Sequence, residues 1–322
     1  MESVGPKPVR FKLTPQLRRS TFAPMEHKRK NILLAVVSIV AILVIGATFA
    51  LWNPTPPPVV TMPVPNGYAA FAPAGAMVQR RTWDFSKMDE LQLRFLVDAN
   101  SNALQMARAG LAEKSRVPME FSLPYVSAHM QDLSQLKMLA QAFLAEGHLA
   151  ELEKRTNDAA QSYVDATRLG IYCRQGGNVM DGLIGLSIEP MGTLSLQNGV
   201  PNLDARTSAE LARKLETAAS DEESWAQIRE NENTWSSRTF PGLQYRVAAF
   251  FRRKATKAED AKMEKKFNAQ QNRTRRLMLD LAAHAYQLDK GHRPTNLADL
   301  VPAYLKTAPI DPLTGKEMTL TP

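Results

Sequence analysis

The chain has few of the residue types from which metal centres and covalent cross-links are built. One cysteine, Cys173, occurs among 322 residues, so an internal disulfide and a thiolate metal cluster are both excluded. The five histidines are His27, His129, His148, His284 and His292. They lie far apart and none belongs to a His-Glu-x-x-His motif, so we predict no metal site. Cys173 is predicted to be a small buried apolar residue.

Motifs that carry nucleotide or acyl-transfer chemistry are also missing. No glycine-rich loop follows a strand-like run, and no Gly-x-Ser-x-Gly sequence occurs. The carboxylates with acid-base potential are Glu222, Glu223, Glu230 and Glu232. Because glutamate-rich helix surfaces are common, we nominate no catalytic, cofactor-binding or metal-binding residue. We predict that the protein is not an enzyme and needs no cofactor.

The longest apolar run is Ile32–Trp52, which contains no charged side chain and follows Lys28, Arg29 and Lys30. A helix rises about 1.5 Å per residue, so this run matches a hydrocarbon core of roughly 30 Å. It predicts a transmembrane helix over residues 31–52. A cleaved signal peptide is the alternative, but bulky Trp52 and its neighbours leave no small-residue cleavage site. An uncleaved signal anchor is therefore favoured.

The net charge of +8 comes mainly from one short segment. Residues 1–30 hold eight basic and two acidic residues, or +6, and the rest holds 32 basic and 30 acidic residues, or +2. Basic flanks stay in the cytoplasm, which predicts an inner-membrane protein with a cytoplasmic tail over residues 1–30 and an extracytoplasmic C-terminal part. The tail is predicted to contact the anionic bilayer, and no nucleic-acid partner is predicted.

Proline and helical patterns divide the remainder. Six prolines in residues 53–65 predict a semi-rigid, extended stalk. Apolar residues then recur at three- and four-residue spacings, which predicts a helical extracytoplasmic domain over residues 66–258. A long helix and a C-terminal module are predicted over residues 259–322. The apolar stretch Val179–Leu196 contains Asp181, Glu189 and Pro190, and it predicts a buried core helix rather than a second membrane span.

Basic residues concentrate again between Arg252 and Arg276, with ten basic residues against three acidic ones. A solvated helix that lies against an acidic remainder of the domain is the simpler interpretation. A surface for lipid headgroups, an anionic polymer or an acidic partner is the alternative.

About the last 46 residues follow a distinctive order: a helical stripe from Leu277, a loop, a short helix and an Asp-Pro turn. The pattern is made by Tyr286, Asp289, Gly291, Pro294, Thr295, Leu297, Leu300, Val301, Pro302, Tyr304, Leu305, Ala308, Pro309, Asp311, Pro312, Gly315 and Lys316. It resembles the C-terminal module of type II secretion major pseudopilins, which implies a small sheet after the turn, with Met318–Leu320 as one strand. Gly291 is expected to cap the long helix and Asn296 the short one.

Two features of that family are missing from this chain. Thirty residues precede the apolar run instead of a short leader, and the chain ends before the family's acidic calcium loop. Prepilin processing, filament formation and calcium binding are therefore not expected here. From Asn66 onward the chain also resembles a group of uncharacterised single-pass bacterial membrane proteins that end in this module.

The sequence thus predicts a mainly α protein with one transmembrane helix, an extracytoplasmic helical domain and a small C-terminal α/β element. We expect a membrane-anchored interaction or scaffold protein of the bacterial envelope, beside a secretion or pilus-like system. Its partners are expected to be the lipid bilayer and other envelope proteins. One alternative is an envelope hydrolase with a cleft among Glu222, Arg229, Glu230 and His148. The other is a helical module that binds a ligand or peptide in an apolar concavity.

Overall fold

The computed structural model describes residues 24–52, 61–79, 84, 87–240, 242 and 257–320. The chain divides into two compact units, Met1–Pro56 and Pro57–Pro322, and each is described by itself. Some predictions lie outside the described residues: the basic tail over 1–23, the stalk over 53–60, and the basic residues 252–256.

The first unit contains helix α1, Pro24–Trp52. Its side chains are described for residues 32–48, and its large apolar ones are at least half exposed. In the part of the chain that the structure describes, no helix combines the length and apolar character needed to cross a membrane. This finding corrects the predicted transmembrane helix over 31–52, the single-pass signal anchor and the inner-membrane location.

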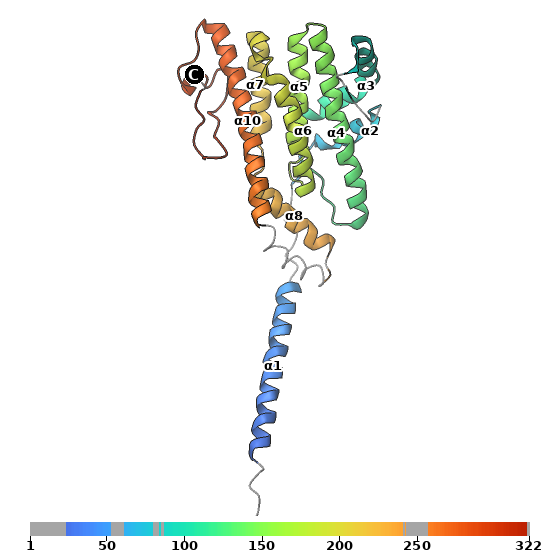
Figure 1. The fold of residues 1–322 in the computed structure, drawn as a ribbon, viewed down its shortest axis with the longest axis vertical. Helices are drawn as coiled ribbons and strands as arrows, with labels where there is room; N and C mark the ends of the chain where they lie inside the picture. The colour runs from blue at the N-terminus through green and yellow to red at the C-terminus, as the bar shows by residue number, and fades with distance from the viewer. Residues whose placement is uncertain are drawn as a thin grey trace, which may run out of the picture. The chain divides into compact units, whose positions relative to one another are not determined.

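The second unit is built from helices, as the sequence predicts (Figure 1). They are α2 (Tyr68–Met77), α3 (Glu90–Leu111), α4 (Leu123–Leu152), α5 (Thr156–Tyr172), α6 (Val179–Gln197), α7 (Ala205–Ser220), α8 (Trp225–Thr239) and α10 (Lys257–Lys290), with the 3-10 turns η2 (Val200–Asn202) and η3 (Leu297–Asp299). Short polar side chains begin most of them. Asp89, Ser122, Asn178, Asp204 and Ser224 each accept a backbone N–H of the first helical turn.

Helix α5 lies at the centre of this unit. It packs against α4, α6 and α7, while α2, α3 and α4 contact one another and α10 contacts α6, α7 and α8. Figure 1 shows α4, α5, α6, α7 and α10 as neighbouring helices. Every residue from Ser162 to Tyr172 is buried. An amphipathic surface helix exposes one face, so α5 is a core helix.

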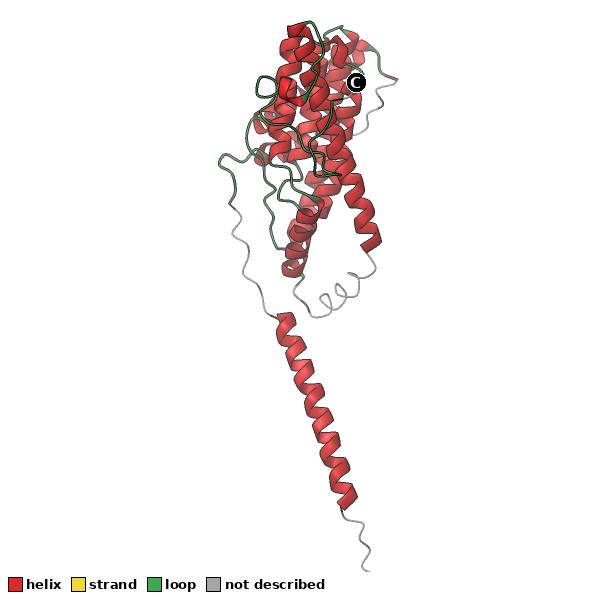
Figure 2. Ribbon diagram, turned by 90° about the vertical axis from the view of Figure 1, so that its left-hand side faces the viewer, coloured by secondary structure: helices red, strands yellow, loops and turns green. Residues whose placement is uncertain are grey.

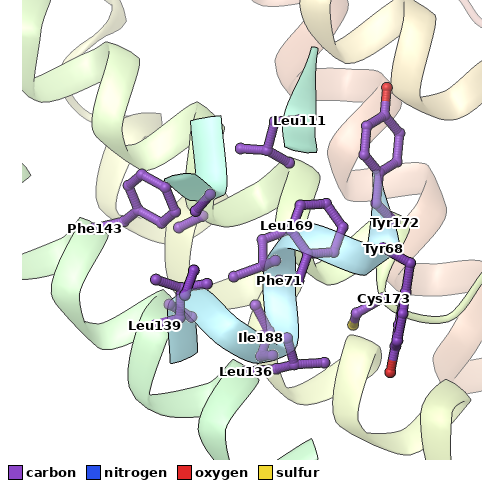
Figure 3. Close-up of a cluster of buried hydrophobic side chains, with 14 of the residues drawn as sticks. Tyr68, Phe71, Leu111, Leu136, Leu139, Phe143, Leu169, Tyr172, Cys173 and Ile188 are labelled. Atoms are coloured by element: carbon purple, nitrogen blue, oxygen red, sulfur yellow. The ribbon is translucent and has the colours of Figure 1, made fainter. Parts of the chain in front are cut away.

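Two large apolar clusters fill the spaces between these helices. The first joins α2, α3, α4, α5 and α6, and Figure 3 shows Phe71, Leu136, Leu139, Leu169 and Ile188 meeting there. The second joins α5, α7 and α10 to the C-terminal segment. Its members include Leu211, Leu215, Leu281, Leu300 and Met318. The C-terminal residues are thus part of the core of this unit.

Close backbone approach between α5 and α6 depends on glycine. A Cβ added at Gly192 would overlap the carbonyl oxygen of Tyr163, and one at Gly185 would overlap the carbonyl oxygen of Gly170. Asp181 and Glu189 of α6 are fully buried, and Pro190 lies inside the helix. The prediction of a buried core helix over this stretch is therefore confirmed.

The C-terminal segment differs from the predicted α/β element. Among the described residues no strand forms, and Figure 2 shows the segment as loop beside the helices. An isolated antiparallel bridge joins Ile310 to Glu317. Proline has no backbone N–H to donate, and Pro309 and Pro312 flank the turn, so pairing stops after one bridge. The predicted small sheet, with Met318–Leu320 as a strand, and its pseudopilin-like topology are therefore wrong.

The local turn chemistry of that segment follows the sequence. Helix α10 ends at Lys290, and Gly291 follows with φ +77°. Asn296 caps η3 through the N–H of Asp299. Gly315 has φ +71°, and its N–H donates to the Asp311 carbonyl at 2.8 Å. The predicted caps and tight turn are confirmed, because each depends only on residues close in sequence.

Candidate functional site

A largely apolar cavity lies beside α8, between segments that are far apart in sequence. Its volume is about 360 Å³. It is lined by Met62, Arg116, Val117, Pro118, Met119, Glu120, Phe121, Gly176, Asn231, Thr234 and Trp235. We call it the α8 groove. The lining combines apolar and aromatic side chains with a few polar ones, which is the usual composition of a binding site.

One wall of the α8 groove is the irregular segment between α3 and α4. The side chain of Asn66 holds this segment by donating to the Arg116 carbonyl at 2.8 Å and accepting the Arg116 N–H at 2.9 Å. The next N–H, of Val117, donates to the Gln175 carbonyl at 2.8 Å, and the Val117 side chain is buried. Anchors on two separate elements therefore hold the wall in place before any ligand arrives.

The other wall is α8. The indole N–H of Trp235 donates to the Glu120 carbonyl at 2.9 Å, so it ties α8 to the facing segment. Its ring is nearly buried and packs edge-on against Phe240 at 6.1 Å between centroids. Phe121, in contrast, is 43% exposed, and the Arg238 guanidinium lies 5.0 Å from its ring centroid. The groove thus has a fixed tryptophan and an accessible phenylalanine.

Two charged residues line the α8 groove, Glu120 and Arg116. The Arg116 guanidinium lies 3.5 Å from the Glu223 carboxylate. Glu223 also accepts the Gly176 N–H at 2.9 Å and the Asn231 amide at 3.2 Å. The buried Nε of Arg116 has no hydrogen-bond partner among the described residues. A buried donor without an acceptor is costly, and the Glu223 carboxylate beside the guanidinium offsets part of that cost.

A second group of charges is enclosed rather than open. The buried Arg174 pairs with Glu189 of α6 and with Glu222 after α7, and its guanidinium lies 4.6 Å from the Phe267 ring centroid of α10. Thr274 donates its hydroxyl to Glu189. Burial raises the pKa of Glu222 to about 7, and Arg174 opposes that rise. The charges neutralise one another and bind four elements together.

The carboxylates considered from sequence are distributed over different environments. Glu222 is enclosed with Arg174, Glu223 holds Arg116, and Glu232 accepts the Val179 N–H at 3.3 Å. Burial raises the pKa of Glu232. Glu230 is exposed on α8. Each of the three buried or half-buried carboxylates thus has a structural partner.

The cleft expected for a hydrolase involves two further residues. His148 of α4 lies 3.6 Å from Glu151 one turn away, and Arg229 of α8 lies 3.2 Å from Asp260 of α10. Neither residue lines the α8 groove, and Glu222 and Glu230 do not line it. The structure therefore does not bring these four residues into that cavity.

Cys173 is fully buried at the end of α5, as predicted. Burial raises the pKa of its thiol to about 12, so the thiolate is scarce at neutral pH. The basic residues of α10 are described from Lys257 onward. Arg275 faces Glu222 at 3.7 Å, while Lys262, Lys265 and Lys266 are exposed. This part of α10 is a solvated basic surface anchored by a buried face.

Sequence reasoning missed the α8 groove. Trp225 and Trp235 lie at helical spacing in the sequence, which predicts two packing residues on one face of a helix. Trp225 does pack, against Phe267 at 5.9 Å, but Trp235 also lines the groove. The sequence signal that could have indicated the groove is the segment around Phe121. There Pro118 and Pro124 interrupt the helical pattern and leave an aromatic residue between two helices.

No protein-family model matches the chain, and no curated protein and no solved structure matches it. The resemblance of the last 46 residues to the pseudopilin module therefore stays a prediction.

Proposed function

We propose that this protein is an interaction protein without catalytic activity, and that it binds an extended peptide segment of a partner protein in the α8 groove. The observation that carries this proposal is a pre-formed cavity of about 360 Å³ in which Trp235 and Phe121 flank an apolar floor. A large apolar side chain of the peptide packs against that floor. The wall between α3 and α4 is anchored through Arg116 and Val117, which reduces the entropy that binding must overcome.

The backbone of the groove favours an extended peptide over a rigid small molecule. Among the described residues, the N–H groups of Met119 and Phe121 donate no backbone hydrogen bond. A peptide beside this segment supplies carbonyl acceptors in the manner of an added strand. The chemistry required of the partner is therefore one large apolar side chain within an extended, carbonyl-rich segment.

Selection of displayed random peptides against the purified full-length chain tests this proposal. Enriched peptides are expected to share a large apolar or aromatic residue and to bind with affinities on the order of micromolar. Phe121→Asp and Thr234→Arg place charge in the groove and are expected to weaken binding about tenfold or more. The matched control is Phe95→Asp on α3, where the phenylalanine is 77% exposed and outside the groove.

Two results would contradict the proposal. One is the absence of any enriched peptide class. The other is peptide binding that survives both groove substitutions or disappears with Phe95→Asp. Far-UV circular dichroism of each variant separates lost binding from lost folding.

A further inference from the structure

A second cavity, lined mainly by α10, has a different chemistry. Its volume is about 260 Å³. Asp280, Ala283, His284 and Gln287 all line it from α10, at the spacing of one helix face. The remaining lining residues are Val200, Leu279, Arg293, Pro294 and Leu320. We call it the α10 cavity, and the α8 groove shares no residue with it.

The polar side chains of the α10 cavity have unused binding capacity. Asp280 is half-buried, and burial raises the pKa of its carboxyl while Arg276 opposes the rise. Its carboxylate makes no hydrogen bond or ion pair with a described residue, and neither do the exposed side chains of Gln287 and Arg293. Asp280 is thus a half-buried carboxylate without a hydrogen-bond partner in the described protein, while the exposed Gln287 and Arg293 lining the same cavity are free to bind a ligand.

His284 adds an acceptor to the same cavity. Its Nε2 lies 3.1 Å from the Leu203 carbonyl oxygen. A carbonyl only accepts, so Nε2 carries the proton and Nδ1 of the neutral ring carries the lone pair. His284 and Asp280 therefore both accept hydrogen bonds, whereas Arg293 only donates them.

We propose that the α10 cavity binds a small α-amino acid with an aliphatic side chain. Its ammonium group donates to Asp280 and His284, and its carboxylate accepts from the Arg293 guanidinium and the Gln287 amide. The aliphatic side chain lies against Val200, Leu279 and Leu320. A carboxylate, a guanidinium and an apolar wall in one small cavity match the three parts of such a ligand. A metal ion fits less well, because the described residues hold no group of three or more metal-ligating side chains.

Isothermal titration of the purified full-length chain with L-leucine, L-isoleucine and L-valine tests the proposal. Saturable binding is expected, and Asp280→Asn and Arg293→Gln are each expected to weaken it about tenfold or more, because each removes a charge-assisted hydrogen bond. Asp98→Asn is the matched control, since Asp98 is an exposed carboxylate on α3 outside the cavity.

Modified ligands assign the two ends of the site. L-leucine methyl ester lacks the carboxylate, so its weaker binding should be insensitive to Arg293→Gln. N-acetyl-L-leucine lacks the ammonium group, so its binding should be insensitive to Asp280→Asn. Ala283→Met fills the cavity and is expected to abolish binding of all three amino acids.

Absence of saturable binding up to about 10 mM for all three amino acids would overturn the proposal. Binding that is unchanged in both Asp280→Asn and Arg293→Gln would also overturn it. The outcome is independent of the α8 groove, because no residue tested here lines that groove.

Discussion

At the scale of single residues, the buried charges between α5, α6 and α10 contribute most to how these helices are arranged. Arg174 is almost completely enclosed, and Glu189 and Glu222 neutralise it. Removing one partner of a buried ion pair typically costs about 3–5 kcal/mol, because the remaining charge is left without compensation. The cluster therefore fixes which surfaces of these helices meet. The sequence indicated that Glu189 is buried, but it did not reveal Arg174 as its partner.

Glu222 predicts a specific pH dependence of stability. Burial raises its pKa from the ordinary 4.5 to about 7 in the folded protein. Between these values the folded state binds more protons than the unfolded state, so the free energy of unfolding falls as pH rises from about 4.5 to about 7. Glu222→Gln removes the titrating group and should flatten this part of the profile. Urea unfolding at several pH values measures it.

The control for this prediction is Glu210→Gln. Glu210 is an exposed carboxylate that pairs with Arg206 one turn away on α7. Its substitution should leave the wild-type profile between pH 4.5 and 7 unchanged. Parallel profiles for the wild-type protein and Glu222→Gln would show that Glu222 does not titrate in this range.

At the scale of elements, the contact between α5 and α6 depends on the absence of side chains. Gly170, Gly185 and Gly192 let the two backbones approach until a Cβ would overlap the opposite helix. The helical period of α6 was visible in the sequence, and so was its buried character. The partner of its glycine face was not, because periodicity describes one helix and not the neighbour it meets.

Gly192→Ala is expected to destabilise the protein by about 1–3 kcal/mol or more, because the added methyl group pushes α6 away from the Tyr163 carbonyl. Gly199→Ala is the matched control. Its added Cβ meets no atom closer than 3.4 Å, and its φ of −86° suits alanine. That substitution should change stability by no more than about 0.5 kcal/mol. Thermal unfolding of both variants measures the difference, and equal midpoints would contradict this account of the helix contact.

At the scale of the whole molecule, burial is concentrated in α5 and decreases toward α8. α5 is buried without interruption from Ser162 to Tyr172. In α8 the buried residues are Trp225, Ile228, Trp235 and Thr239. Local opening is easiest where few apolar contacts hold an element. The α8 groove is therefore bounded on one side by an element with a small buried face.

Hydrogen exchange followed by mass spectrometry should show this order. Backbone amides of residues 162–172 are expected to exchange most slowly in the second unit, and those of α8 considerably faster. Protection of α8 equal to that of α5 would contradict the order. A peptide selected for the α8 groove should slow exchange in α8 and leave residues 162–172 unchanged.

The sequence by itself determined the features that depend on neighbours along the chain: the helical character, the buried stretch at α6, and the caps at Gly291 and Asn296. Each follows from local backbone preferences or from hydrophobic period. The apolar run Ile32–Trp52 does form a helix. Its predicted membrane crossing is wrong, because no helix in the described part of the chain is long and apolar enough to cross a membrane. The predicted C-terminal sheet is also corrected, because a strand ladder needs a partner strand that the local sequence cannot guarantee.

Only the tertiary structure decided where the cavities lie and which charges meet. The α8 groove joins Met62, Phe121 and Trp235, and the buried cluster joins Arg174 to Glu222. These residues come together because helices pack by burying whole faces, and one chain offers many combinations of faces with similar patterns. Complementary shape and charge in three dimensions select one combination of helix faces. The sequence pattern of each helix does not show which face of another helix it will meet.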